Sequence, residues 1–573
     1  MPPYREDATA EEGLKTLVLL CTALEKLGNG LDLHEIRRWL EEEIPAVEVW
    51  AVPELCGQPG EIAEAVATSG ALRLVLGLCS RDYPQIELHA HARRVGIDPF
   101  GAEVVNLGAY CAQVHPRPWA TDKAKLLLQA AVARALAFPG SQPDSVKPVL
   151  SWNQTVSRRA LFTLPPLHYE PVPFIRPEAC AVEEGCRVCA MTCPREALVA
   201  SEGGRMVLDK THCTGCGACV SVCPQKAINL PGVSPQQIDA QLAALLNTAS
   251  IPLHPRAILF VCARSAPALE RLARNGLSYP AGWLPVEVPC IGMVTPPWLL
   301  HCLSMGAAAT GVLPCLREDC RFGKREVQEG RVGYCREFLG MLGESLDAVR
   351  LLDPNDEGGV ARALDSLPER ATHSGADRPG NVALFGSRPP AQALLRLAEK
   401  FAPSLDRSLV HPYSPVGRVQ VEQGCTACEA CVTACPTGAL AMRRDEEGRA
   451  LTFDTGLCIA CEACVPVCPE KVLRVEKVTD LSRLAQGKLT VYRESEIRCE
   501  ACGAPVAAGA MLGRIAELLG TGDAGIFSFV TRYCVSCRGS LISGRRPIPD
   551  RDGGQTHAME VAVPPPTTRE WNC

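Results

Sequence analysis

Sixteen of the 31 cysteines in this chain fall into four short motifs whose spacing suits iron-sulfur clusters. Three motifs read Cys-x2-Cys-x2-Cys-x3-Cys-Pro and begin at Cys213, Cys425 and Cys458. A fourth begins at Cys180 and has three extra residues in its first gap. In such a loop three thiolates bind one 4Fe–4S cluster, and the fourth cysteine binds the other cluster of a pair. A zinc site does not require four thiols at this spacing followed by proline.

The motifs come in two pairs, so the spacing predicts four 4Fe–4S clusters in two bacterial-type ferredoxin modules, at 171–235 and 416–480. The ligand sets should be crossed within each pair. In the first module they are Cys180, Cys186, Cys189 and Cys223, and Cys213, Cys216, Cys219 and Cys193. In the second module they are Cys425, Cys428, Cys431 and Cys468, and Cys458, Cys461, Cys464 and Cys435.

Two Cys-x2-Cys pairs near the C-terminus predict a different kind of metal site. They are Cys499 with Cys502 and Cys534 with Cys537, inside a segment expected at 481–545. Four thiolates in this pattern suit tetrahedral structural zinc, although the gap between the pairs is longer than in a common zinc ribbon. Mononuclear iron or a small cluster is the alternative. Cys573, in a tail at 546–573, is interpreted as a bystander.

Two further regions must position the remaining cysteines, because each alternates short apolar strands with amphipathic helices. Such alternation predicts a parallel α/β sheet in each region, at 1–140 and 255–370. In the first region the expected strands end near Cys21, Cys56, Cys79 and Cys111. In the second they end near Cys262, Cys290 and Cys315, with Cys320 in the following loop.

Open α/β sheets bind ligands outside the carboxyl ends of their strands, so each set of four thiols can converge on one metal site. A single free cysteine is more often a small buried hydrophobe. That is the interpretation preferred for Cys302 and Cys335, which fall within predicted helices. We expect linkers at 141–170 and 371–415 and a helical connector at 236–254.

Composition narrows the class of protein. Hydrophobic residues make up 47% of the 573 residues and charged residues 21%, which is typical of a globular protein. The net charge of −6 is not gathered into runs, which argues against a nucleic-acid partner. No apolar stretch reaches the roughly 20 residues that span a bilayer, and the acidic N-terminus is not a secretory signal. We therefore expect a cytoplasmic protein with metal-bound cysteines rather than disulfides.

The N-terminal region resembles the N-terminal domain of the heterodisulfide reductase A subunit. The residues that carry the resemblance lie at 55–60, 78–81 and 105–115. The resemblance implies a fifth 4Fe–4S cluster, held by Cys21, Cys56, Cys79 and Cys111. That family usually has Cys-x-Cys-Gly at the end of its first strand, and only Cys21 remains here. This departure leaves two alternatives. Either one cysteine suffices at this strand, or the cluster is lost, and we favour the interpretation that the cluster is retained.

The region 255–370 resembles the delta subunit of methyl-viologen-reducing hydrogenase. The matching residues are at 260–262, 288–292 and 314–322. The resemblance implies a 2Fe–2S cluster bound by Cys262, Cys290, Cys315 and Cys320, and electron transfer between a hydrogenase and heterodisulfide reductase. The family often has further cysteines just after the first, where this chain has Ala263, Arg264 and Ser265.

Other cofactor and catalytic motifs are missing from the sequence. A flavin domain is also part of the heterodisulfide reductase family resembled here, but the segment Gly520–Gly525 follows an expected helix rather than a strand, so we predict no flavin. No P-loop, haem motif or nucleophile elbow occurs. His89 and His91 fit a solvated helix face. His212 could tune the cluster of Cys213 or be a plain loop residue.

The sequence thus predicts a multidomain α/β protein. It comprises two small parallel-sheet domains, two α+β ferredoxin modules and a zinc-ribbon-like finger. The leading hypothesis is an electron-transfer subunit of a larger oxidoreductase. By resemblance its partners would be a hydrogenase, a formate dehydrogenase or another oxidoreductase, and on the other side a flavoprotein or a heterodisulfide-reductase-like unit. One alternative is a catalytic oxidoreductase with an open iron site in the N-terminal domain. Another is a redox-sensing zinc and iron-sulfur scaffold.

Overall fold

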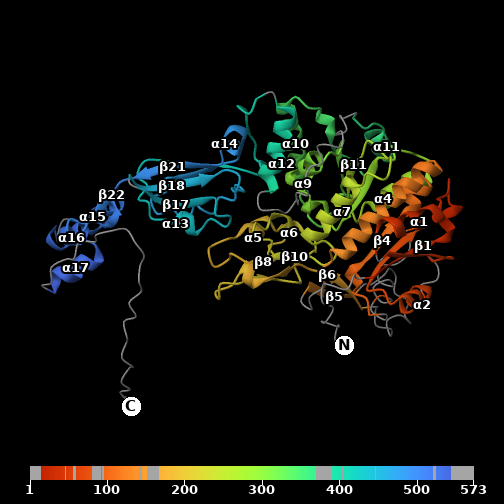
Figure 1. The fold of residues 1–573 in the computed structure, drawn as a ribbon, viewed down its shortest axis with the longest axis horizontal. Helices are drawn as coiled ribbons and strands as arrows, with labels where there is room; N and C mark the ends of the chain where they lie inside the picture. The colour runs from red at the N-terminus through yellow and green to blue at the C-terminus, as the bar shows by residue number, and fades with distance from the viewer. Residues whose placement is uncertain are drawn as a thin grey trace, which may run out of the picture. The chain divides into compact units, whose positions relative to one another are not determined.

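A computed structural model gives the three-dimensional structure of the chain (Figure 1). It describes residues 15–45, 47–55, 60–80, 92, 96–140, 145–150, 167–368, 389–402, 404–445, 447–520 and 524–543. The chain divides into two units. The second unit comprises Gln423–Cys428, Met442–Leu451 and Tyr492–Cys573, and the rest belongs to the first. Within the described ranges, no helix has both the length and the apolar character that crossing a bilayer demands.

The N-terminal region of the first unit forms a four-stranded parallel sheet, as predicted. Its order is β2-β1-β3-β4, with strands Thr16–Cys21 (β1), Val47–Val52 (β2), Arg73–Leu78 (β3) and Ala102–Asn106 (β4). Every residue of β1 is buried, because this strand is central and helices cover both faces of such a sheet. The helices are Leu33–Glu43 (α1), Gly60–Ser69 (α2) and Arg117–Leu136 (α4). Asp32 caps α1 by accepting from the amide of Glu35.

A second four-stranded parallel sheet in the same unit repeats this strand order. It runs β12-β11-β13-β14, with strands Ala257–Cys262 (β11), Trp283–Val288 (β12), Thr310–Leu313 (β13) and Val349–Leu351 (β14). The accompanying helices are Ala266–Arg274 (α8), Pro296–Ser304 (α9), Arg325–Leu342 (α10) and Glu357–Leu364 (α11). In both sheets the first strand in sequence lies between the second and the third.

The two sheet domains pack on one another across a polar contact and share one apolar core. Helix α7 (Pro235–Asn247), the predicted connector, lies along α4, as the orange and yellow-green helices of Figure 1 show. Arg134 of α4 bonds to the Gly232 carbonyl and to Gln241 of α7. Tyr110 donates to Glu287 of β12 at 2.5 Å. These hydrogen bonds join the two sheet domains, which belong to one compact unit.

The first ferredoxin module is built from short elements around two cysteine loops. Strands Phe174–Ile175 (β7) and Ile228–Asn229 (β10) pair antiparallel, and Leu198–Ala200 (β8) and Met206–Leu208 (β9) form a hairpin. Helices Val188–Thr192 (α5) and Ala218–Val222 (α6) each lie at the end of a cysteine loop and pack on each other. Each cysteine motif of this module thus forms a loop followed by a short helix, as the repeated motif predicts.

The second module has the same plan with longer strands. Strands Arg418–Val421 (β16) and Leu473–Glu476 (β19) pair antiparallel and flank both cysteine loops. Strands Leu440–Asp445 (β17), Gly448–Asp454 (β18) and Lys488–Glu494 (β21) form a sheet in the order β17-β18-β21. Helix Ala430–Thr433 (α13) lies at the end of the first loop. The boundary between the units passes through this module.

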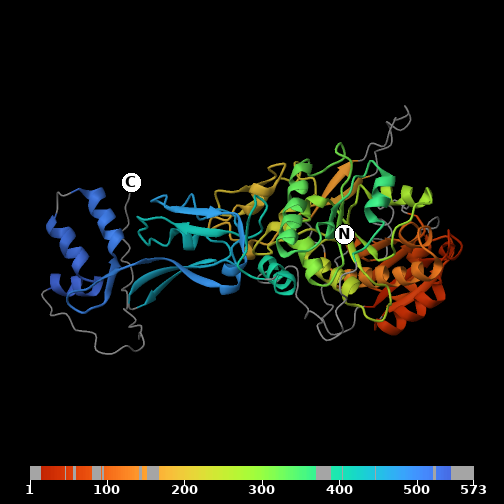
Figure 2. The same cartoon turned by 90° about the horizontal axis from the view of Figure 1, so that it is seen from above.

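The second unit ends in the predicted finger, which is mainly helical. A hairpin of Glu496–Arg498 (β22) and Pro505–Ala508 (β23) precedes helices Gly509–Leu519 (α15), Ala524–Arg532 (α16) and Val535–Ile542 (α17). Figure 2 shows these helices in dark blue, gathered beside the hairpin. The zinc-ribbon likeness of this segment stays a prediction.

Two segments predicted to be linkers contain ordered elements. Within 141–170, strands Val146–Leu150 (β5) and Leu167–Pro171 (β6) form a hairpin. Within 371–415, helix Pro389–Phe401 (α12) packs against α9 and buries Leu394 and Leu397. Strand Ser408–Val410 (β15) then pairs with Val478–Asp480 (β20). The apolar face of α12 is therefore part of the core. The prolines at the start of this helix made the segment look like a linker in the sequence.

Candidate metal centres

In the first ferredoxin module the structure gathers the thiols in crossed sets. Burial raises the pKa of Cys189 to about 12, and the neighbouring thiols of Cys223, Cys186 and Cys180 contribute to the rise. Burial likewise raises the pKa of Cys216, and the nearby thiols of Cys193 and Cys213 add to the rise. Each motif's fourth cysteine therefore lies beside the first three of the other motif. Such mutual repulsion is the environment that bound iron neutralises.

The second of these sets surrounds a cavity. It is lined by the four cysteines together with small and apolar neighbours such as Pro173, Ala197 and Leu208. The four thiols that line it are Cys193, Cys213, Cys216 and Cys219. Gly215 and Gly217, on either side of Cys216, have positive φ, which winds the chain around this space. The donor set and its enclosed space fit a cubane cluster held by four thiolates.

Backbone amides aim at several of these sulfur atoms. Gly215 donates to the Cys213 sulfur at 3.4 Å, Ala197 to Cys193 at 3.4 Å, and Ala227 to Cys223 at 3.3 Å. An amide that points at sulfur stabilises a thiolate and raises the reduction potential of a bound cluster. These loops are thus arranged for anionic sulfur rather than for neutral thiols.

The second module repeats this chemistry in the part that belongs to the first unit. Burial raises the pKa of Cys464 to about 12, with the thiols of Cys458, Cys435 and Cys461 adding to it. These are the four members of one predicted set. Ala460 donates its amide to the Cys458 sulfur at 3.4 Å. Cys425 and Cys428 belong to the second unit, so the other predicted set remains a prediction from spacing.

The second sheet domain places its four cysteines at the carboxyl edge of the sheet. Cys262 ends β11, while Cys290 and Cys315 lie two residues beyond β12 and β13. Hydrogen bonds from Cys290 and Cys315 lower the pKa of Cys262, and Cys320 in turn bonds to Cys290 and Cys315. The sulfur atoms therefore form a ring. Gly292 donates its amide to Cys290 at 3.4 Å, and Gly323 donates to Cys320 at 3.3 Å.

The first sheet domain assembles part of its predicted set. Cys79 lies just after β3, and its sulfur is 3.8 Å from that of Cys21, the last residue of β1. Cys56 falls outside the described residues. Cys111 does not end a strand as expected. It lies in a turn of π-helix, η3 (Gly108–Ala112), that follows β4.

The turn η3 packs tightly on the loop that carries Cys79. A Cβ on Gly108 would sit 1.9 Å from the Cys79 carbonyl oxygen, so only glycine allows this approach. Cys111 is buried, which raises the pKa of its thiol to about 12, while the ammonium of Lys123 opposes the rise. Lys123 is therefore the nearby charge that favours an ionised Cys111.

Both sheet domains put cysteines at the same topological position. In an open sheet of order 2-1-3-4 the crevice lies where the connections diverge, between the first and third strands. Cys21 and Cys79 follow β1 and β3, and Cys262 and Cys315 follow β11 and β13. The fourth predicted ligand differs, because Cys111 follows the fourth strand and Cys320 lies in the loop after the third. The fold thus offers the same crevice twice.

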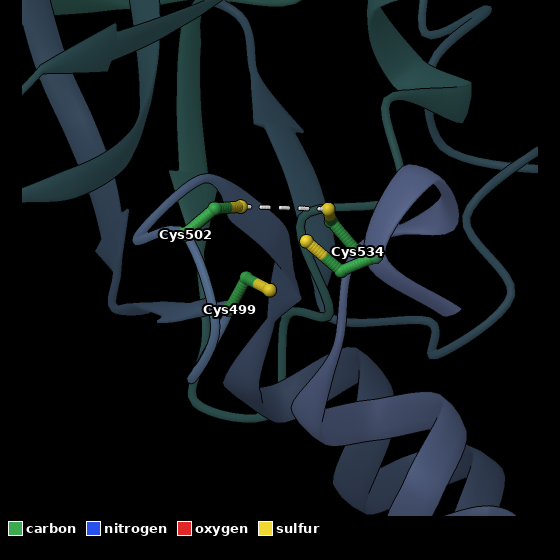
Figure 3. Close-up of side chains that lie close together, drawn as sticks. Cys499, Cys502 and Cys534 are labelled. Carbon is green, nitrogen blue, oxygen red and sulfur yellow. Dashed lines mark hydrogen bonds between the residues drawn. The ribbon is translucent and has the colours of Figure 1, made fainter. Parts of the chain in front are cut away.

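The finger brings four thiols closer together than the other sets. Cys499, Cys502, Cys534 and Cys537 have sulfur atoms that all lie within 4.8 Å of one another. Figure 3 shows three of them labelled, with the 3.6 Å contact between Cys502 and Cys534 dashed. Burial opposes ionisation of Cys499, but amides of Cys534, Ala501 and Cys502 outweigh it and lower its pKa to about 6.

This difference in spacing separates two kinds of centre. In the described part of the chain, the finger is the one place where three or more potential ligand atoms lie within 4.8 Å of one another. Four sulfurs about 2.3 Å from a single zinc ion must be this close. A full set of sulfurs that each bind a different iron of a cubane cannot all lie this close together, although the one pair Cys21 and Cys79 is 3.8 Å apart. The finger therefore fits a single ion, and the ferredoxin sets fit clusters.

Other residues singled out from the sequence have plainer surroundings. Cys302 in α9 and Cys335 in α10 are fully buried in the core. His212 is exposed and its Nδ1 lies 2.6 Å from Asp209, which favours the loop interpretation. Gly520 follows α15 with positive φ and is a helix end. His89 and His91 lie outside the described residues.

Two buried cations beside the cysteines have no signal in the sequence. Lys123 is fully buried on α4, and its Nζ lies 3.0 Å from His115 Nε2 and 3.4 Å from the Tyr279 hydroxyl. Arg331 is buried on α10 beside the second sheet domain's cysteines. Lysine and arginine at helical positions ordinarily indicate a solvated face. Only packing reveals that these two turn inward.

Family models match three parts of the chain. The delta subunit of methyl-viologen-reducing hydrogenase matches residues 257–371, a 4Fe-4S dicluster domain matches 424–472, and a 4Fe-4S binding domain matches 206–229. These matches confirm the hydrogenase delta-subunit resemblance and the presence of 4Fe–4S ferredoxin domains. The matched ranges do not include the Cys180 motif, which stays a prediction.

Three curated relatives each match this chain over a small part of their own length. The A 1 iron-sulfur subunit of the CoB–CoM heterodisulfide reductase of Methanopyrus kandleri is 28% identical over 122 residues, 21% of this chain and 18% of that protein. The A subunit of the ferredoxin:CoB-CoM heterodisulfide reductase of Methanosarcina acetivorans is 30% identical over 123 residues (21% and 15%). A protein of Archaeoglobus profundus that is named as similar to the heterodisulfide reductase A subunit is 32% identical over 130 residues (22% and 18%). The chain thus spans less than a fifth of each relative, and its similarity to these proteins is confirmed.

Proposed function

We propose that this chain is an iron-sulfur electron-transfer subunit of an oxidoreductase complex, and that it relays electrons between partner subunits. The observation that carries the proposal is that successive thiol sets adjoin one another inside the first unit. Electron transfer needs centres close together and screened from water, and it needs no substrate pocket. The family models that match this chain describe a hydrogenase delta subunit and 4Fe-4S domains, which suit such a relay.

One junction joins the second sheet domain to the first ferredoxin module. Ala218, Cys290 and Phe322 form a small buried apolar cluster, against which Cys216 and Cys320 pack. Two prospective centres therefore share a single layer of side chains. Thr214 of the module also donates to the carbonyl of Arg321 at 3.3 Å. This contact supports direct exchange between the centres of Cys213 and Cys262.

A second junction joins the two ferredoxin modules. Among the causes that raise the pKa of Cys461, burial is the largest, and the thiol of Cys186 in the other module is near enough to contribute. Gln225 of the first module donates to the Pro436 carbonyl of the second. The centre of Cys180 therefore adjoins that of Cys458, which supports a path from the sheet domain through both modules.

The proposed inventory is four 4Fe–4S clusters in the modules, a fifth in the N-terminal domain, a 2Fe–2S cluster in the delta-like domain, and zinc in the finger, without flavin. The cluster ligands are the sets given above. The proposed partners are a hydrogenase, a formate dehydrogenase or another oxidoreductase, and a flavoprotein or a heterodisulfide-reductase-like unit, in the cytoplasm. The similarity to A subunits of heterodisulfide reductases supports the heterodisulfide reductase part of this proposal.

Metal and sulfide analysis of anaerobically purified protein tests this inventory. Five 4Fe clusters and one 2Fe cluster predict roughly 22 iron atoms per chain, together with one zinc ion. About 16 iron atoms would mean that only the ferredoxin modules are loaded, and both sheet-edge centres would be rejected. Stoichiometric reduction by a low-potential donor, followed by transfer to an acceptor without conversion of a small molecule, is expected of a relay.

A further inference from the structure

Arg331 occupies the junction between the second sheet domain and the first ferredoxin module. Its side chain is buried, and its Nη1 donates to the carbonyls of Gly292 at 2.8 Å and Val294 at 3.0 Å. The guanidinium carbon lies 5.8 Å from the centre of the Phe322 ring. Phe322 is the residue that packs with Cys290 and Ala218 in the apolar cluster of the junction. Arg331 therefore lies directly behind the layer that separates the two centres.

The positive charge of Arg331 has neutral hydrogen-bond partners only. They are the two carbonyls and the Gln328 amide oxygen at 3.3 Å, and no carboxylate pairs with it among the residues that the structure describes. Burial lowers its pKa to about 10, and the nearby groups that oppose this are Tyr413, Cys290 and Cys216. A buried charge is normally paired with an opposite charge. Cys290 and Cys216, one from each proposed centre, lie close enough to interact with this charge, and each would be an anionic thiolate when it binds iron.

Arg256 offers a comparison within the same unit. It is also buried and also bonds to carbonyls only, those of Leu253, Leu245 and Ile251. One of these carbonyls, that of Leu245, lies in the last turn of α7, where the helix dipole favours a cation. Burial alone lowers the pKa of Arg256 to about 10, and no thiol contributes. Arg256 thus shows what a purely structural buried arginine looks like here.

We propose that Arg331 is a positioning residue that acts as a shared counter-cation for the centres of Cys262 and Cys213 and raises the reduction potential of both. The inference rests on the proposed relay function. One electron leaves one centre and one arrives at the other, so the total charge near Arg331 is unchanged by transfer between them. The guanidinium keeps its proton throughout, and an electron on either side is stabilised by the same fixed charge.

Redox titration of the full chain, followed by electron paramagnetic resonance, tests this assignment. In Arg331→Met both centres should be harder to reduce. At a fixed ambient potential the reduced-to-oxidised ratio of each should fall about tenfold, which is about 59 mV for a one-electron couple. Arg331→Lys, which keeps the charge, should restore most of the difference. Arg256→Met is the matched control and should leave both potentials unchanged, as should the centre of Cys458 in every variant.

Iron content and the far-ultraviolet circular dichroism spectrum are measured alongside, because an uncharged residue could impair assembly. If Arg331→Met loses iron, Arg331→Gln, which keeps a donor for the Gly292 carbonyl, replaces it in the titration. Loss of iron at these two centres in both uncharged variants but not in Arg331→Lys would also support the counter-cation. Full loading with unchanged potentials, or loss of iron in all three variants, would overturn it in favour of a structural clamp. Shifted potentials without onward transfer would instead reject only the relay.

Discussion

At the scale of single residues, several buried charges lie beside the proposed centres or at the contact between the two sheet domains. Lys123 is fully buried beside Cys111, and burial lowers its pKa to about 7. Its partners His115 and Tyr279 are neutral side chains, and burial together with Lys123 keeps His115 uncharged by lowering its pKa. An anionic thiolate at Cys111 would supply an opposite charge for Lys123, which is consistent with the N-terminal centre proposed above.

Glu103 gives a prediction about pH at this scale. It lies on β4, 14% exposed, with its Oε1 3.1 Å from Arg134 Nε. Burial raises its pKa to about 7 against the pull of Arg134, and Glu287 adds to the rise. Because the folded-state pKa is above the unfolded value of 4.5, the folded state holds more protons between pH 4.5 and 7. The free energy of unfolding should therefore fall as pH rises through this window.

Anaerobic urea denaturation at pH 5 and pH 8 measures this effect. The side chain of Glu103→Gln cannot ionise. This variant should therefore lack the decrease in the free energy of unfolding, about 2 kcal/mol, that the unsubstituted chain shows across this range. The comparison uses the difference between the two pH values in each protein, which cancels the effect of all other groups. Equal differences in both proteins would contradict the assignment of a raised pKa to Glu103.

At the scale of elements, the strand edges and the loops behind them decide which centres meet. The loop after β12 carries Cys290 and Gly292, and it touches both the sheet domain's own cysteines and α6 of the ferredoxin module. A Cβ on Gly292 would lie 2.7 Å from the Phe322 ring, too close for the ring to remain in place. The absence of a side chain at Gly292 thus lets Phe322 fill the junction.

Gly292→Ala should therefore disturb this junction. Overpacking of this kind costs about 1–3 kcal/mol, and displacement of Phe322 should slow electron exchange between the two centres. Gly333→Ala on α10 is the matched control, since a Cβ there meets nothing within 4 Å and alanine favours a helix. Stopped-flow reduction monitored at the two centres gives the exchange rate. Equal rates in the two variants would show that Phe322 packing does not limit exchange.

At the scale of the whole molecule, the chain combines a large unit that carries most of the proposed centres with a smaller one that carries the finger. In the large unit one apolar core runs through both sheet domains and α12. In the small unit the finger's helices expose several large apolar side chains, among them Leu518, Leu519, Val535 and Ile542. With so little apolar burial, the finger is expected to depend on its metal to fold.

Metal removal should consequently affect only the finger. A zinc chelator should release one equivalent of zinc and make the segment 496–543 sensitive to protease, because a structural zinc site contributes directly to folding. The visible absorbance of the clusters should persist. Cys502→Ser should give the same protease pattern without chelator, and Cys302→Ser, in the core of the other unit, controls for loss of a thiol. Release of iron instead of zinc would identify the finger as an iron site.

The sequence alone was enough to predict what depends on local spacing. Ferredoxin cysteines lie within a few residues of one another, so their motif predicts the cluster type, the crossed sets and the repeated turn before folding is considered. Strand–helix alternation likewise predicted both parallel sheets, because period and turn residues are local properties. Cys111 was placed wrongly at a strand end, since a π-helical turn leaves no mark in the hydrophobic pattern. The apolar face of α12 was hidden within an apparent linker.

Only the tertiary structure decided which centres adjoin. Cys216 packs against the small cluster that contains Cys290, and Cys186 comes near Cys461, across separations that no sequence pattern encodes. The inward turn of Arg331 and Lys123 was equally invisible, because a charged residue on a helix is buried only when its neighbours enclose it. Local chemistry therefore specifies what each cysteine loop can bind. Long-range packing specifies the order of the centres and the charges that surround them.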